Sequence, residues 1–229
     1  MGRGRVVRTI GAVVRKDLRV ELRTKESVPA MALFAVTTFV VFHFGLDRNT
    51  LEGELAAGVL WVTLLFAAIL GINRLFVAER EQSGFDGLLL APIDRGALLA
   101  AKAAALFIYL IALELIAVPV FALFFIKSGF WNALPLLAVV VVLADVGIAV
   151  VGALLASIAV NTRARDLLLP LLLLPLTIPA IIAAAAATKP LLSLPLDTSG
   201  TGKWIAVLAL YDALFGLLSY ALFDFLMEE

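Results

Sequence analysis

The sequence predicts an all-α integral membrane protein, in which an amphipathic helix at the membrane surface precedes a bundle of six transmembrane helices. Three observations predict this fold class. Of the 229 residues, 63% are hydrophobic, whereas soluble domains are roughly half apolar. Six apolar runs are about as long as the roughly 20 residues that cross a bilayer as a helix. These runs are continuous and do not alternate as the ten-residue strands of a membrane barrel do.

Residues 1–27 form the predicted amphipathic helix. Steps of three and four residues place five apolar side chains on one stripe: Val7, Ile10, Val14, Leu18 and Leu22. Eight lysines and arginines surround the stripe, so we expect the helix to lie on the membrane with its cations toward anionic lipid. A secretory signal would have a longer apolar core, and here Lys16 and Asp17 interrupt it.

The six predicted spans follow in order, at residues 28–46, 55–77, 97–126, 131–160, 167–187 and 204–227. The third and fourth are longer than a bilayer requires, so we expect them to tilt or to extend beyond the hydrocarbon. We find no internal repeat and no stretch with the pattern of a soluble domain. The whole chain, residues 1–229, is therefore expected to be one transmembrane domain with both termini on the same side.

The distribution of lysine and arginine predicts the orientation. Fourteen of the 18 lie in the N-terminal segment, within residues 74–102 or at residues 163–165, and four lie in the connections on the opposite side. Cytoplasmic loops carry the excess of basic residues. Both termini and the connection after the second span are therefore predicted to be cytoplasmic.

The connection at residues 79–95 is the most patterned polar stretch of the chain. Charges at positions 79–81 and 86 precede a cluster of leucines that a proline stops. The predicted contact residues are Glu79, Arg80, Glu81, Phe85, Asp86, Leu88, Leu89, Pro92 and Arg95. A cytoplasmic element of this kind is suited to a soluble partner, because its leucines supply apolar burial while its charges orient it at the rim. The alternative is a solvated loop that binds nothing.

A second cytoplasmic contact is predicted at the turn between the fourth and fifth spans. Arg163, Arg165 and Asp166 cluster there. The alternative is that these cations only anchor the turn on the cytoplasmic side of the membrane.

Three carboxylates lie within the predicted spans: Glu114, Asp145 and Asp212. An ionised carboxylate in hydrocarbon is unfavourable by a few kcal/mol, so such residues rarely face lipid. They are expected either to line a pathway or a partner-binding surface, or to bond to a neighbouring helix. Asp145 is the strongest functional candidate because it lies midway along an apolar run, whereas Asp212 is expected to serve helix packing. Both interpretations stay open for Glu114.

The fourth span carries a face of small residues, Gly147, Gly152, Ala153 and Ala156. Small residues let helices approach closely. This face is therefore expected to be a packing surface, either within the bundle or toward a second copy of the chain, so a homodimer is one open arrangement.

The sequence offers few residues for metal, redox or nucleic-acid chemistry. There is no cysteine, and the single histidine is His43, which is either a haem-proximal residue or an ordinary residue at the membrane interface. No cluster of histidine, cysteine and carboxylate has the spacing of a metal site. The formal net charge is zero, so charge does not indicate a nucleic-acid partner.

Residues 199–203 (SGTGK) look like the end of a phosphate-binding loop, but the surrounding pattern is wrong. Asp197 stands where that loop has its first glycine, and Trp204 follows the lysine in place of serine or threonine. The segment also lies on the predicted outer side, where ATP is absent. We therefore expect no catalytic residue and no ATP hydrolysis by this chain.

Several motifs together resemble a known family. Residues 79–81 (ERE), 88–92 (LLLAP) and 94–95 (DR), followed by Lys102, resemble the cytoplasmic loop of the ABC-2 class of ABC exporter permeases. More narrowly, the chain is similar nearly end to end to the haem exporter permease of cytochrome c maturation, protein B of that system (the CcmB family). The stretches that carry this resemblance are residues 16–26 (KDLRVELRTKE), 58–61 (GVLW), 71–76 (GINRLF), 161–170 (NTRARDLLLP) and 211–212 (YD).

The resemblance implies a function and a set of partners. It implies a six-span permease subunit in the bacterial inner membrane, with haem as the molecule that is exported or handed over and no cofactor bound by this chain. ATP would be hydrolysed by a separate cytoplasmic subunit, protein A, which would bind the connection at residues 79–95. The other implied partners are the haem-handling membrane protein C, a small membrane protein D and the periplasmic haem chaperone, protein E, whose haem-loaded form is released.

Two other function classes stay open from the sequence. An ABC-2 exporter of lipid-linked saccharides or drugs would share the connection at residues 79–95 but would lack the stretches at residues 16–26 and 161–170. A secondary transporter would need no ATPase, and it should show paired repeats or broken helices near the middle of the membrane. We find neither feature in the sequence.

Overall fold

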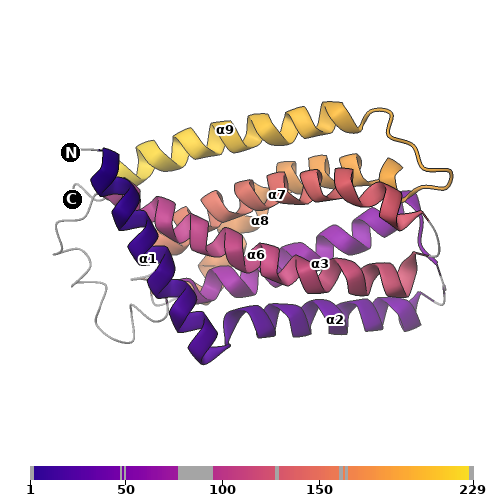
Figure 1. The fold of residues 1–229 in the computed structure, drawn as a ribbon, viewed down its shortest axis with the longest axis horizontal. Helices are drawn as coiled ribbons and strands as arrows, with labels where there is room; N and C mark the ends of the chain where they lie inside the picture. Colours follow the sequence, from indigo (N-terminus) through magenta and orange to yellow (C-terminus); the bar gives the residue numbers. More distant parts are fainter. Residues whose placement is uncertain are drawn as a thin grey trace.

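The computed structural model describes residues 3–46, 48, 50–76, 95–126, 129–159, 162 and 165–226. The described residues are mostly helical and contain no strand (Figure 1). The elements are α1 (Arg3–Thr24), α2 (Ser27–Gly45), α3 (Gly53–Arg74), α6 (Arg95–Phe125), α7 (Phe130–Ala159), α8 (Arg165–Thr188), the 3-10 turn η1 (Pro190–Leu192) and α9 (Thr201–Leu226).

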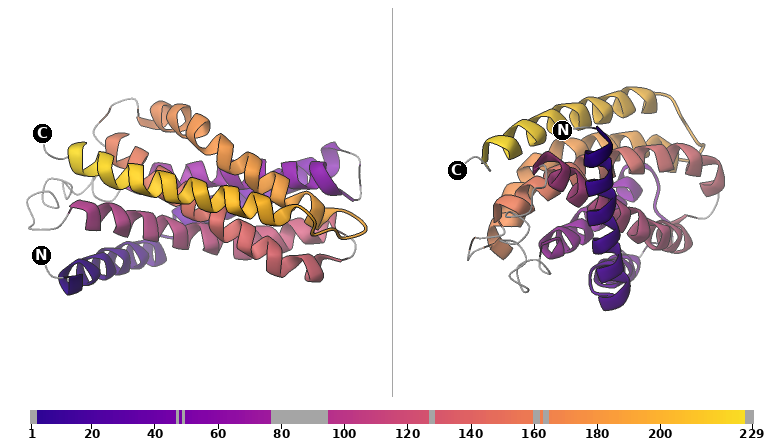
Figure 2. Two further views of the ribbon diagram at one scale, coloured as in Figure 1. Left: turned by 90° about the horizontal axis from the view of Figure 1, so that it is seen from above. Right: turned by 60° about the vertical axis from the view of Figure 1, so that its left-hand side comes forward.

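Six of these helices, α2, α3, α6, α7, α8 and α9, are long and apolar enough to cross a membrane. They run side by side along the long axis of the molecule (Figures 1 and 2). The start of α1 and the end of α9 lie at one end of the bundle, which we call the α1 end, and the connections between α2 and α3, α6 and α7, and α8 and α9 lie at the far end. The predicted fold class is therefore confirmed.

Helix α1 lies obliquely across its end of the bundle and packs on α6 (Figure 1). The cluster that it buries consists of Val13, Leu98 and Ala101, flanked by Ile10 and Val14. Val7 and Leu22, two members of the predicted apolar stripe, are instead exposed, at 69% and 74%. The protein-facing side of α1 is thus centred on Val13. The exposed side chains of Val7 and Leu22 are suited to contact with the membrane surface.

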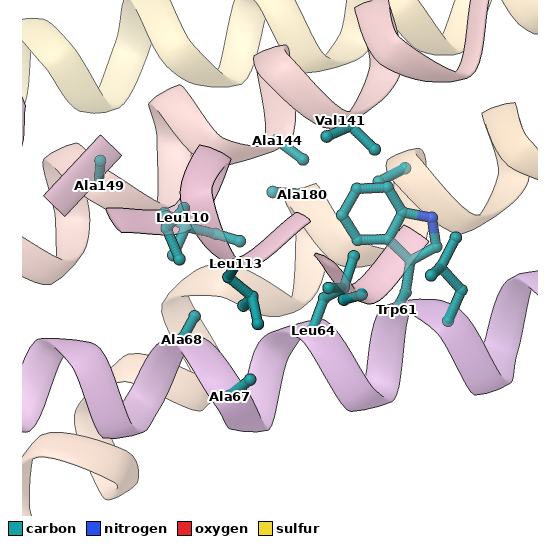
Figure 3. Packing of buried hydrophobic residues seen from close by; sticks show 14 of the residues in the cluster. Trp61, Leu64, Ala67, Ala68, Leu110, Leu113, Val141, Ala144, Ala149 and Ala180 are labelled. Carbon is teal, nitrogen blue, oxygen red and sulfur yellow. The ribbon is translucent and has the colours of Figure 1, made fainter. Parts of the chain in front are cut away.

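α3 forms the centre of the bundle. Within its apolar span 72% of the residues are buried, against 22% for α2 and 17% for α9. Its large and small side chains interdigitate with those of the surrounding helices (Figure 3). The indole Nε1 of Trp61 donates a hydrogen bond to the Thr188 hydroxyl of α8 at 3.0 Å, so the polar edge of this buried ring has a partner.

α8 contains three prolines, at positions 170, 175 and 179. Each removes a backbone donor from the helix. The hydroxyl of Tyr211 on α9 donates to the carbonyl oxygen of Leu176 at 2.9 Å. This bond joins α9 to the proline-containing stretch of α8.

Gly147 and Gly152 of α7 lie where the neighbouring helices come closest. A Cβ atom at position 152 would lie 2.8 Å from Ile72 of α3 and 3.1 Å from Leu106 of α6. A Cβ atom at position 147 would lie 2.7 Å from the carboxylate of Asp212 on α9. The small face predicted on this helix is therefore a packing surface within the bundle.

The substitution Gly152→Val tests this packing. It should lower the free energy of unfolding by about 1–3 kcal/mol, because Ile72 and Leu106 are buried and have no room to move away. Gly216→Val on α9 is the control, since an added Cβ atom there meets nothing within 4 Å. Unfolding of both purified variants in one detergent is the measurement, and equal stability would contradict the close approach of α3, α6 and α7.

Candidate functional site

The segment that the sequence predicts to bind a partner lies outside the described residues, except for Arg95, where α6 begins. The predictions for its other residues therefore stay predictions: Glu79, Arg80, Glu81, Phe85, Asp86, Leu88, Leu89 and Pro92. Of the second predicted contact, Arg163 also lies outside the described residues, while Arg165 and Asp166 begin α8. The structure does describe the place where both ends of the 77–94 segment attach. We call this place the junction; it is formed by α1, the end of α3 and the start of α6.

A buried ion pair between α1 and α6 lies at the centre of the junction. Lys102 Nζ lies 2.9 Å from Asp17 Oδ2, and the two side chains are 1% and 8% exposed. The same ammonium group donates to the carbonyl oxygen of Leu75 at 3.2 Å and lies 4.9 Å from the centre of the Phe76 ring. One buried cation therefore joins α1 and α6 to the residues that follow α3.

Asp17 has two further partners. The hydroxyl of Tyr109 on α6 donates to the Asp17 carbonyl oxygen at 3.2 Å. Lys16 Nζ lies 3.1 Å from Asp17 Oδ1 and is half exposed. Each carboxylate oxygen of Asp17 thus faces a cation, as a buried charge requires, and this arrangement fixes the position of α1 along α6.

The turn from α1 to α2 is held by the carboxylate of Glu21. It accepts hydrogen bonds from the backbone N–H groups of Ser27 at 3.0 Å and Val28 at 2.9 Å. The first N–H groups of a helix lack partners within the helix, so Glu21 caps α2. Lys25 ends α1 in the left-handed conformation, with φ of 53°, and its N–H donates to the Glu21 carbonyl oxygen at 2.7 Å.

Arg74, in the last turn of α3, contacts this same turn. Its Nη1 lies 3.1 Å from Glu26 Oε2, and both side chains are exposed. An exposed pair of this kind contributes only about 0–1 kcal/mol. Its value lies in its position, because it brings the α1–α2 turn to the point where the chain leaves α3 for the 77–94 segment.

The junction bonds three parts of the chain to one another. Lys102 bonds α6 to α1 and to the residue that follows α3, and Arg74 bonds the last turn of α3 to Glu26 in the α1–α2 turn. Closely packed interiors transmit strain and do not absorb it. We therefore expect a displacement of any one of α1, α3 and α6 to be passed to the other two.

Sequence reasoning missed the pairing of Asp17 with Lys102. It treats Asp17 only as an interruption of an apolar stripe and Lys102 only as part of a motif. A signal was available, because Lys102 is a lone cation among alanines and leucines, and such a residue needs a buried partner of opposite charge.

Two of the three intramembrane carboxylates come together in the structure. Glu114 of α6 and Asp145 of α7 are 7% and 2% exposed, and their carboxyl groups face each other within hydrogen-bonding distance. Asp212 lies against Gly147 of α7. Both carboxylate oxygens of Asp212 are buried, and no described residue bonds to them, so its role in helix packing stays a prediction.

His43 lies near the far end of α2 among aromatic side chains. Its ring centre is 5.3 Å from that of Phe44, 5.2 Å from Phe124 and 5.9 Å from Phe125. Its Nδ1 is buried, and no described residue bonds to it. In the described part of the chain, no group of three or more histidine, cysteine or carboxylate side chains is arranged to hold a metal ion. A haem-proximal role for His43 stays a prediction.

Comparison with known proteins decides the family. The sequence profile described as CcmB protein matches residues 8–222, from α1 into α9. The chain belongs to the CcmB family. The match includes all six spans and both members of the buried ion pair, so the junction lies within the part of the chain that defines it as a CcmB protein.

Three proteins named Heme exporter protein B illustrate the similarity within the CcmB family. The protein of Paracoccus denitrificans is 32% identical over 180 residues, which are 78% of this chain and 81% of that protein. The protein of Pseudomonas aeruginosa is 30% identical over 198 residues, or 86% and 87% of the two chains. The protein of Bradyrhizobium diazoefficiens is 26% identical over 208 residues, or 90% and 93%.

The buried ion pair can be tested by neutralising one partner at a time. Asp17→Asn should lower the free energy of unfolding by about 3–5 kcal/mol, because it leaves the ammonium group of Lys102 buried without its counter-ion. The double variant Asp17→Asn with Lys102→Met should lose less than this single variant, since no buried charge is left. Unfolding of the purified variants in detergent is the measurement.

The matched control for this test is the exposed ion pair of the far end. Lys189 Nζ lies 3.0 Å from Glu54 Oε2, and the side chains are 53% and 85% exposed. Lys189→Met should therefore change stability by no more than about 1 kcal/mol. Equal effects of Asp17→Asn and Lys189→Met would contradict the burial of the junction pair.

Proposed function

We propose that this chain is the permease subunit of an ABC-type haem export system that serves cytochrome c maturation. The observation that carries the proposal is the CcmB family match over residues 8–222, together with relatives named Heme exporter protein B. Six helices able to cross a membrane supply the architecture of a permease. In this proposal haem is cargo of the complex, and the whole chain acts as one permease domain with no catalytic residues.

We propose further that a separate cytoplasmic ATPase subunit, protein A of the system, binds the segment at residues 79–95. A soluble ATPase can act on a membrane bundle only through a surface that both proteins contact. The junction supports this role, because α3 and α6 carry the two ends of the segment, and Lys102 of α6 bonds both to α1 and to the residue that follows α3. Displacement of the segment would then reach three helices at once.

The orientation and the remaining partners belong to the same proposal. The excess of lysine and arginine at the α1 end favours a cytoplasmic location for both termini in a bacterial inner membrane. The far end then faces the periplasm, where the haem chaperone, protein E, would be loaded and released. Membrane proteins C and D would complete the complex, with His43 at the far end as the candidate haem-proximal residue.

Leu88→Glu and Leu89→Glu test the proposed ATPase contact at residues 79–95. Each places an unpaired charge in the proposed apolar interface and should reduce copurification of the ATPase subunit by roughly tenfold or more. Yield of mature cytochrome c should fall in parallel, whereas insertion into the membrane should not change. Leu196→Glu, in the connection at the far end, is the control and should leave ATPase copurification intact. Full ATPase association in both leucine variants would mean that the segment is only a linker.

The second predicted contact can be separated from a simple membrane anchor. Arg163→Lys with Arg165→Lys keeps both charges but removes the planar, bidentate geometry of the guanidinium groups. If these side chains bind a partner, cytochrome c maturation should fall severalfold at normal membrane insertion. Wild-type activity of the double variant would assign the two arginines to orientation alone.

A further inference from the structure

A groove runs between α6 and α7 in the half of the bundle nearer the far end. It has a volume of about 620 Å³, and its walls are almost entirely apolar. It extends along α6 from Ile111 to Ile126, which is about 22 Å at the rise of an α-helix. Leu115, Leu123 and Trp131 line it and are 73%, 83% and 78% exposed. The groove therefore opens outward from the bundle.

An acidic group lies near the inner end of this groove. Glu114 lines the groove, and Asp145 lies behind it on α7. Oε2 of Glu114 and Oδ2 of Asp145 are buried, and no donor from the described residues reaches either atom. A hydrogen bond between two carboxyl groups uses a single proton and leaves acceptor positions vacant. In hydrocarbon no water is present to fill them, so a donor from another molecule would complete the bonding of these acids.

The chemistry of the groove distinguishes between its candidate occupants. A lipid acyl chain would fill the apolar walls but would leave the carboxyl oxygens without a donor. A second copy of the chain would bring acid against acid, because among the described residues the lysines and arginines lie at the two ends of the bundle and not near the depth of Glu114. A transmembrane helix with a basic side chain near mid-membrane satisfies both the apolar walls and the acid.

We propose that the α6–α7 groove is the docking site for a transmembrane helix of a partner subunit, which places a basic side chain against Glu114. The proposal rests on the proposed function in one respect, since it requires that the chain works with another membrane protein. Polar pairs between helices fix the register of association in a membrane. Glu114 thus specifies which helix fits the groove and at which depth it sits, while the apolar walls supply packing area.

Photocrosslinking in cells that express the complete system tests the proposal. With p-benzoylphenylalanine in place of Leu123, irradiation should give an adduct with a membrane-spanning peptide of another subunit, and mass spectrometry should find a lysine, arginine or histidine in that peptide. Glu114→Gln keeps the size of the side chain and its bond to Asp145 but removes the charge. It should lower the adduct yield about tenfold, which corresponds to the loss of one charged pair.

Three controls make the result decisive. An adduct formed from the same photoreactive residue at Leu210, which is exposed on α9, should not respond to Glu114→Gln. Ala138→Trp fills the groove from its exposed wall on α7 without touching either acid, and it should abolish the Leu123 adduct even if Glu114→Gln proved unstable. Glu114→Lys, combined with an acidic residue in place of the partner's basic one, should restore the adduct.

The proposal is overturned if the Leu123 adduct forms only with lipid or with a second copy of the chain. It is equally overturned if the captured helix has no basic residue, or if neither Glu114→Gln nor Ala138→Trp lowers the yield. Loss of the proposed ATPase contact at residues 79–95 gives a different result from loss of the helix docked in the groove. Leu89→Glu should reduce ATPase copurification and leave the Leu123 adduct intact, because the groove lies in the other half of the bundle.

Discussion

The buried pair of Asp17 and Lys102 is the interaction on which the α1 end of the structure depends. Two charges removed from water are tolerated only where each has a close partner of opposite sign and the remaining polar atoms are bonded. Here the ammonium group meets a carboxylate on α1, a carbonyl oxygen after α3 and an aromatic face beside it. The cationic helix α1 is consequently fixed to α6 and, through Lys102, to the end of α3.

This ion pair lies at the end of α3, the helix at the centre of the bundle, so the α1 end and the centre are directly connected. α3 is the most enclosed span, and it leads directly to the junction. Its neighbours α6 and α7 approach it closely, because glycines and alanines take the place of bulky side chains at the contacts. Apolar burial does not drive association between helices within lipid, so tight packing and polar pairs determine the arrangement. The junction and the core are therefore connected through groups in direct contact.

Composition and periodicity were sufficient to predict the six spans, the surface helix and the small face of α7, because each of these features is local in the sequence. The pairings were not predictable in this way. Asp17 with Lys102, and Glu114 with Asp145, join residues far apart in the chain, and only the packing of α1 on α6 and of α6 on α7 brings them together. The periodic pattern also did not identify which side of α1 is buried. Val13 and Asp17 face α6, while Val7 and Leu22 stay exposed.

Because the chain has no cysteine, single-cysteine labelling tests most directly the claim that the junction end faces the cytoplasm and meets an ATPase. One cysteine would replace Leu89 and another, in a separate variant, Leu196. A membrane-impermeant maleimide added to intact spheroplasts should label position 196 alone. Position 89 should react only after the membrane is opened, and the ATPase subunit should protect it. Labelling of position 89 from outside, or equal labelling with and without the ATPase, would contradict the account.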